Sequence, residues 1–153
     1  MTLGSGGLYL MKTIVVTLLM LVFTLLGCWH LYWSVGGLVM RTASLPSING
    51  KPVFKPGPLL TTLVGCLLFS TAGLVAATGG LIAVPLSSGL LNGLCYVLAM
   101  VFLLRAIGDF KLVGFFKQVR DSQFARWDSL AYSPLCLVLS AGLFLIGRGV
   151  LTG

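Results

Sequence analysis

The feature that most constrains this sequence is a 49-residue stretch, positions 56–104, that contains no charged residue. One membrane-spanning helix needs about 20 apolar residues, so this stretch is too long for one span and predicts two. The uncharged runs at 13–40 and 129–147 each predict one more span. Only 8% of the residues are charged, whereas soluble domains carry about a quarter. We therefore predict an integral membrane protein with four spans and no separate soluble domain.

Proline and glycine residues set the limits of the predicted spans. Segment 41–58, which we call loop 1, holds four of the six prolines and an Asn49-Gly50 turn signal, so it cannot continue a helix. The connection at 79–89, loop 2, is short and uncharged, which predicts a helical hairpin on either side of it. The expected fold is all-α, a transmembrane four-helix bundle in a single domain, 1–153. Its predicted spans are 14–39, 59–78, 90–107 and 131–151, and residues 1–10 have no assigned role.

The last long connection, loop 3, lies at 108–130 and concentrates the charge of the chain. It holds seven of the thirteen charged residues (ten basic plus three acidic), including every acid, between Asp109 and Asp128. Its apolar residues share one face at helical spacing, which predicts a short amphipathic interfacial helix within 109–128. These apolar residues are Leu112, Phe115, Phe116 and Val119.

Two roles are open for the acids of loop 3. Arg105 is four residues from Asp109 and is expected to pair with it, and Asp121, Arg126 and Asp128 are expected to form a second exposed network. In that case the loop is solvated and orients the protein. The alternative is that an acid of loop 3 is buried and acts as a general acid or base, or binds a polar headgroup.

The basic residues also predict an orientation. Loops 1 and 3, together with Arg105 at the end of the third span, carry eight Lys and Arg residues, whereas only Lys12 and Arg148 lie on the other side. Because Lys and Arg near span ends favour the cytoplasm, we expect loops 1 and 3 in the cytoplasm and both termini outside. The predicted location is the bacterial inner membrane. A net charge of +7 is explained by these loops, and nucleic acid is not an expected partner.

The polar residues within the spans give further candidates. His30 is the only histidine and is eleven residues, about 16 Å of helix rise, from Arg41, which would place it deep in the bilayer. It either forms a structural hydrogen bond across the bundle, with Asn92 or Tyr96 as partner, or belongs to a functional site. The combined candidate ligand or polar core site comprises His30, Tyr32, Asn92, Tyr96, Asp109, Arg126 and Asp128.

One cysteine falls in each predicted span. Small-residue neighbours favour a packing role for Cys28, Cys66, Cys95 and Cys136, with a soft metal site as the alternative. No CxxC pair, catalytic motif or nucleotide-binding motif is present, so we predict no metal, cofactor or catalytic residue. A lipoprotein signal ending at Cys28 is a second interpretation of the N-terminal region, although the apolar sequence continues beyond that cysteine to Arg41.

Four segments resemble, in order and spacing, a widespread bacterial family of small four-span membrane proteins described as a domain of unknown function. They are "HLYWSVGG" (30–37), "KPVFKPGP" (51–58), "LRAIGDFKLVGFFKQVR" (104–120) and "FARWDSLAYSPLC" (124–136). The resemblance spans about 11–150. It implies a multi-pass membrane protein and brings no activity or site residue with it.

Three functions are compatible with these features. The favoured one is a membrane protein without catalytic activity that binds a lipid, a small apolar ligand or a partner subunit. The alternatives are a membrane-embedded enzyme acting on a lipid or isoprenoid, and a small dimeric transporter. Expected partners are the bilayer itself, anionic lipid at loop 3, and a second copy or another membrane subunit.

Overall fold

The computed structural model describes residues 5–48 and 51–149. The described chain is all-α apart from one short hairpin. Its long helices are α1 (Ser5–Ser34), α2 (Pro58–Thr78) and α3 (Ser88–Ile107), followed by a continuous rod made of α4 (Gln123–Trp127), the π-helical turn η2 (Asp128–Tyr132) and α5 (Ser133–Gly147).

Loop 1 contains the remaining elements. A short 3-10 turn, η1 (Thr42–Ser44), precedes the strands β1 (Ser47–Ile48) and β2 (Lys51–Pro52), which pair antiparallel with Ser47 opposite Pro52. The Asn49-Gly50 turn signal lies between the two strands, outside the described residues.

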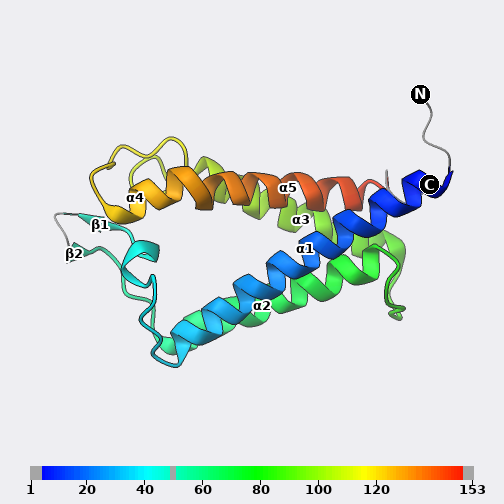
Figure 1. Cartoon of the computed structure of the whole chain (residues 1–153), viewed down its shortest axis with the longest axis horizontal. Coiled ribbons are helices and arrows are strands. Elements are labelled where there is room, and N and C mark those ends of the chain that lie inside the picture. Colours follow the sequence, from blue (N-terminus) through cyan, green and yellow to red (C-terminus); the bar gives the residue numbers. More distant parts are fainter. Residues whose placement is uncertain (1–4, 49–50, 150–153) are drawn as a thin grey trace.

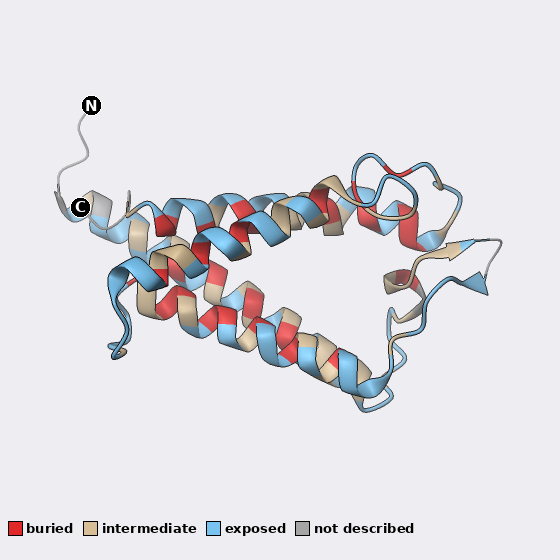
Figure 2. Cartoon of the chain, turned by 180° about the vertical axis from the view of Figure 1, so that it is seen from behind, coloured by how far each residue is buried: buried red, intermediate tan, exposed pale blue. Residues whose placement is uncertain are grey.

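The long helices form two antiparallel pairs (Figure 1). Helix α1 packs along α2, and α3 packs along α5; the two pairs meet near the N-terminal half of α1 and diverge toward loops 1 and 3 (Figures 1 and 2). The fully buried ring of Phe23 lies at this meeting point, 5.4 Å from the ring of Phe102. The predicted bundle is therefore an open V of two helix pairs. Its shared core consists of Val16, Leu19, Phe23, Leu68, Ala72, Val75, Cys95, Ala99, Leu139, Leu143 and Ile146.

Four stretches are long and apolar enough to cross a membrane: Tyr9–Ser34, Pro58–Thr78, Ser88–Ile107 and Gln123–Gly147. Their outward faces are apolar and exposed over most of their length (Figure 2), with Leu59 85% and Leu130 79% exposed. Such faces are unfavourable in water and favourable in lipid. The chain is an integral membrane protein in contact with the bilayer, as the sequence predicts.

Helix α1 ends at Ser34, five residues before the predicted limit of the first span. Gly36 adopts φ +98°, and the N–H of Gly37 donates to the carbonyl of Tyr32 at 2.9 Å. This glycine-terminated helix end satisfies carbonyls of the last turn and reverses the chain. The sequence "VGGLV" is apolar enough to continue a span, but its glycines stop the helix.

Small residues allow the helices of each pair to approach closely. A Cβ atom on Gly65 of α2 would lie 3.3 Å from the carbonyl oxygen of Gly27 in α1. In the other pair, the hydroxyl of Ser140 donates to the carbonyl of Ala99 at 2.7 Å, which joins α5 to α3. Close packing and interhelical hydrogen bonds of this kind hold helices together in lipid, where the hydrophobic effect contributes little.

The amphipathic interfacial helix predicted within 109–128 is wrong. Residues 108–122 form an irregular folded loop, and helix resumes at Gln123 as the start of the last span. Phe110 has a left-handed φ of +61°, and Gly108 and Gly114 both have φ +90°, so the helical repeat is broken at three places. The face shared by Leu112, Phe115, Phe116 and Val119 therefore does not exist.

Candidate functional site

A buried ion-pair cluster at the base of loop 3 is the most polar part of the described chain. We define the loop 3 cluster as Arg105, Lys117 and Asp128. Asp128 is 0% exposed; its Oδ1 accepts from Arg105 at 2.8 Å, and its Oδ2 accepts from the Lys117 ammonium at 3.1 Å. The N–H of Gly114 donates to the same Oδ2 at 2.7 Å. Two cations and one backbone N–H thus compensate a single carboxylate.

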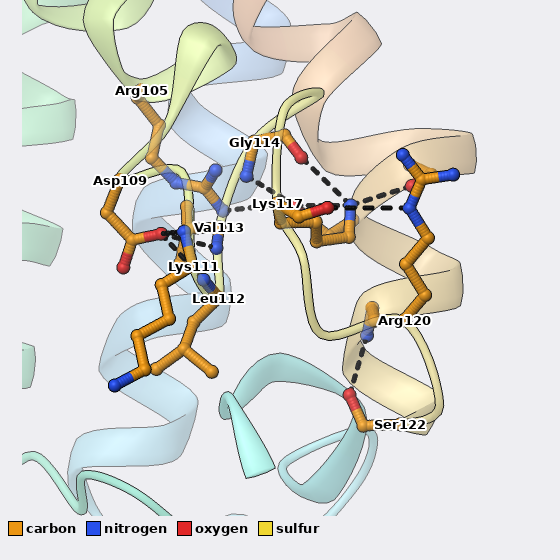
Figure 3. Close-up of polar contacts among 12 residues, drawn as sticks. Arg105, Asp109, Lys111, Leu112, Val113, Gly114, Lys117, Arg120 and Ser122 are labelled. Carbon is orange, nitrogen blue, oxygen red and sulfur yellow. Dashed lines mark hydrogen bonds and ion pairs between the residues drawn. The ribbon is translucent and has the colours of Figure 1, made fainter. Parts of the chain in front are cut away.

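Lys117 is buried with all three of its donors used. Its ammonium donates to Asp128, to the carbonyl of Gly114 at 2.9 Å and to the hydroxyl of Ser129 at 2.7 Å (Figure 3). A lysine side chain that is only 1% exposed is normally too costly, because the charged form loses its hydration. Three acceptors around one ammonium replace that hydration and fix loop 3 against the last span.

The backbone of loop 3 is shaped by Asp109 and two glycines. The Oδ1 of Asp109 accepts from the N–H groups of Lys111, Leu112 and Val113 at 3.0, 2.7 and 2.9 Å (Figure 3). Slight burial raises the pKa of the Asp109 carboxyl, but these N–H donors outweigh it and hold the pKa below its ordinary value. The backbone at Gly108 lies very close to the backbone at Gly114. A Cβ atom on either glycine would therefore overlap backbone atoms on the opposite side of the loop.

The loop 3 acids therefore have different partners from those predicted. Arg105 pairs with Asp128 rather than with Asp109, which instead binds backbone amides. The expected exposed network of Asp121, Arg126 and Asp128 is wrong as well, because Asp128 is fully buried and its partners lie elsewhere. Asp128 also opens the π-helical turn, where the N–H of Ser133 donates back to its carbonyl; such turns are frequent at functional sites.

A second polar region lies between loop 1 and the first helix pair. A cavity of about 230 Å³, which we call the loop 1 pocket, opens there. Helices α1 and α2 and loop 1 all contribute to its wall. It is lined by His30, Trp33, Arg41, Ser44, Leu45, Phe54, Pro56, Leu60, Thr61 and Val64.

The pocket continues the core-facing stripe of α1. Five residues follow one another on this face at spacings of three and four: Leu19, Phe23, Leu26, His30 and Trp33. The first two pack in the core where the helix pairs meet, and the last two line the pocket where the pairs have diverged. The same face of α1 therefore changes from a packing surface to a cavity wall.

The ionisable groups of the pocket are His30 and Arg41, since the Ser44, Thr61 and Trp33 donors are used by backbone carbonyls. The Nδ1 of His30 lies 2.8 Å from the carbonyl oxygen of Leu26; because a carbonyl only accepts, Nδ1 donates this hydrogen bond, and in the tautomer that carries its proton there Nε2 is an acceptor. Arg41 has no carboxylate partner, since all three acids are described and both ion pairs of the described chain use Asp128. The pocket thus combines an unpaired cation and a histidine acceptor with an apolar wall.

The structure divides the predicted site residues between separate places. His30 lies four residues, about 6 Å of helix rise, before the end of α1, so it is nearer to the end of its helix than a span reaching 39 would place it. Tyr32 packs against Gly37 and accepts from the N–H of Val39 at 3.4 Å, so it stabilises the chain reversal. Asn92 and Tyr96 lie on α3, in the other helix pair, where Tyr96 stacks 5.5 Å from Phe144.

Arg126 and the four cysteines do not form a shared site. Arg126 is exposed on α4. Cys28 and Cys66 are exposed, Cys136 is half-buried, and buried Cys95 lies 3.5 Å from the hydroxyl of Thr78. Within residues 5–48 and 51–149, no three His, Cys, Asp or Glu side chains gather in a way that could hold a metal ion.

The set of candidate residues predicted from the sequence lacks three basic residues: Arg105 and Lys117 of the loop 3 cluster, and Arg41 of the loop 1 pocket. Lys117 carries no local signal, because a lysine in a charged loop is normally solvated. Arg41 was assigned only to orientation, although it is the one basic residue next to the aromatic end of the first span. That position beside Trp29, Tyr32 and Trp33 is the signal that the sequence offers.

Four apolar helices, closed at one end by a loop with a buried ion-pair cluster, define a multi-pass integral membrane protein. Residues 23–143 match the family described as protein of unknown function (DUF3995). Because the match covers most of the chain, this protein belongs to that family, which confirms the resemblance of its sequence motifs. Searches of curated proteins and of solved structures each found no match.

Proposed function

We propose that this protein binds a small amphiphilic molecule with an anionic head in the loop 1 pocket. One observation carries the proposal: the core-facing stripe of α1 leaves the packed core and lines a cavity that also contains the unpaired Arg41. Ligand pockets typically combine apolar walls with a few polar groups that orient the ligand.

The lining chemistry supports an amphiphile. Leu45, Leu60 and Val64 provide an apolar wall, and Phe54 and Trp33 add aromatic faces. A guanidinium in such a setting recognises a carboxylate or phosphate. The Nε2 of His30 suits a hydroxyl donor next to that acidic group. A ligand with an anionic, hydroxylated head and a short apolar tail satisfies each of these features.

The loop 3 cluster supports the pocket indirectly. It ties loop 3 to the start of the last span, and α4 in turn packs against η1 of loop 1. Tyr132 also donates to the carbonyl of Ala43 at 3.4 Å, across the open end of the V. In this proposal the buried ions hold loop 1 in place over the pocket, and Asp128 is a positioning residue.

The enzyme alternative has less support. It requires His30 and an acid of loop 3 to face a common cavity, but neither Asp109 nor Asp128 lines the loop 1 pocket. Asp128 is occupied by two cations and a backbone N–H, and Asp109 by three backbone N–H groups. We therefore propose binding rather than catalysis; the dimeric transporter and partner-subunit alternatives rest on the sequence alone.

The proposal also includes the orientation of the protein in the membrane. Loops 1 and 3 lie at one end of the molecule, where η1 contacts α4 (Figure 1). Their seven basic residues, with Arg105 at the end of α3, favour the cytoplasmic side of a bacterial inner membrane, with both termini outside. The exposed Lys111, Arg120 and Arg126 would then face anionic headgroups.

Mass spectrometry of the molecules that co-purify in mild detergent tests the binding. We expect an acidic amphiphile with the wild type, its loss from Arg41→Gln, and a reduced amount with His30→Ala. Lys51→Gln is the matched control, because Lys51 is exposed on β2 outside the pocket lining. The same bound molecules in all four proteins would refute the proposal.

A further inference from the structure

We infer a second binding site, independent of the loop 1 pocket, in a groove between α3 and α5. The groove has a volume of about 560 Å³. We assign it to one acyl chain of an anionic glycerophospholipid, with the lipid phosphate at Arg148. It lies in the other helix pair, so it neither needs nor affects a ligand near His30.

The shape of the groove fits a narrow apolar chain. Its lining combines small residues, of which Ala99 and Ser140 are buried and Ala141 is exposed, with larger ones such as Tyr96, Leu137 and Phe144. Tyr96, Leu137 and Phe144 are 38%, 45% and 46% exposed, so the groove is open on the outer face of the helix pair. Its occupant must therefore come from the bilayer side.

The polarity of the groove fits a hydrocarbon occupant. The Ser140 hydroxyl already donates to the carbonyl of Ala99 at 2.7 Å, which leaves the Tyr96 phenol as the one free side-chain hydroxyl of the lining. No charged residue lines the groove. A strongly polar ligand would lose its hydration there with one phenol to replace it, whereas an acyl chain has none to lose.

The charge at one end of the groove specifies the headgroup. The Arg148 guanidinium lies over the ring of Phe144, 5.8 Å from its centroid, one turn beyond the groove. Arg148 is exposed, immediately after the last span, where lipid phosphates lie. None of the three acids pairs with it, because both ion pairs of the described chain belong to Asp128. An anionic headgroup supplies the missing counter-charge.

The same arginine disfavours a second copy of the chain as the occupant. In a two-fold symmetric dimer of two copies inserted in the same orientation, the axis runs along the membrane normal, so equivalent residues lie at equal depth. Docking groove to groove would then bring two Arg148 guanidinium groups to the same level at one interface. Like charges repel there, whereas a phosphate attracts.

Native mass spectrometry of the purified full-length protein tests this site. The probes are phosphatidylglycerol and phosphatidylcholine with identical acyl chains, added at matched concentrations. We expect the wild type to retain phosphatidylglycerol in preference. Ala141→Phe fills the groove and should remove this lipid, whereas Val138→Phe, which adds a ring to an exposed position outside the groove lining, should not.

A charge variant tests the headgroup assignment separately. Arg148→Gln should lower the preference for phosphatidylglycerol by about fivefold, since one basic residue at a membrane surface contributes an effect of that order. Lys51→Gln, which removes an exposed charge on β2 of loop 1, should leave the preference unchanged. Undiminished lipid retention by Ala141→Phe, or an undiminished preference in Arg148→Gln, would overturn the assignment.

A cross-linking experiment distinguishes a lipid acyl chain from a second copy of the chain as the occupant of the groove. With Ala141→Cys, efficient disulfide-linked dimers that form regardless of added phosphatidylglycerol would identify a second copy as the occupant and overturn the lipid site. Monomers that phosphatidylglycerol protects from thiol labelling at position 141 support it. Adding Arg41→Gln to the Ala141→Cys protein should leave the protection of position 141 by phosphatidylglycerol unchanged, because the loop 1 pocket lies in the other helix pair.

Discussion

The guanidinium of Arg105 at the end of α3 lies 2.8 Å from the carboxylate of Asp128, 23 residues later in the chain. Lys117 approaches the other carboxylate oxygen from within the intervening loop. These contacts convert loop 3 from a flexible connection into a folded cap on the α3–α5 pair. The following predictions test that cap, its backbone geometry and the orientation of the protein.

Replacing Asp128 with Asn should destabilise the protein strongly. The change leaves the buried ammonium of Lys117 and the guanidinium of Arg105 without a counter-charge, and breaking a buried pair in this way costs about 3–5 kcal/mol. Thermal unfolding in detergent measures the loss. Asp121→Asn is the control: Asp121 is exposed, and its change should cost less than about 0.5 kcal/mol. Equal stability of the two variants would show that the cluster is dispensable.

Gly108→Ala and Gly114→Ala should each disrupt loop 3. Both glycines have φ +90°, and a Cβ on Gly108 would overlap the carbonyl of Val113. Backbone strain of this kind costs on the order of 1–3 kcal/mol before any steric overlap is added. Gly93→Ala is a matched control, because that helical glycine has no atom within 4 Å of an added Cβ. We expect Gly93→Ala to leave the unfolding temperature unchanged or higher.

The order of loop 3 should depend on pH through Asp109. Backbone N–H donors lower the pKa of its carboxyl in the folded state. The stabilisation is therefore complete above the pKa of the unfolded chain, and it is lost as pH falls through the lower folded value. Hydrogen exchange of the 111–113 amides, corrected for intrinsic rates, should show falling protection as the pH decreases below the ordinary aspartate pKa of about 3.9. In Asp109→Ala this acid-dependent step should be absent, and its persistence would point to another group.

A reporter fused after Gly153 tests the proposed orientation. With both termini outside, alkaline phosphatase at this position should be active and a fluorescent reporter that folds only in the cytoplasm should be dark. A fusion within loop 3, after Ser122, should give the opposite pattern. Cytoplasmic activity at the C-terminus would reverse the assignment of loops 1 and 3.

The spans were predictable because their signal is local. A run without charge, punctuated by glycine and proline, indicates lipid-crossing helices whatever their partners are. Even so, the uncharged run extends the first predicted span to 39, whereas α1 ends at Ser34 because the chain turns at Gly36, which has a positive φ. The interfacial helix failed for a related reason: helical spacing of apolar residues was present, but Gly108, Phe110 and Gly114 adopt conformations that a helix excludes.

The sequence by itself determined that this is an all-α membrane protein with four spans and two basic loops. Only the tertiary structure decided that the helices form two diverging pairs, that Asp128 pairs with Arg105 and Lys117, and that His30 and Arg41 share a pocket. The reason is physical: hydropathy and helix breaking depend on neighbouring residues, whereas the partner of a charge depends on which distant segments pack together. Burial, which turns a loop carboxylate into the centre of an ion-pair cluster, leaves no trace in the local sequence.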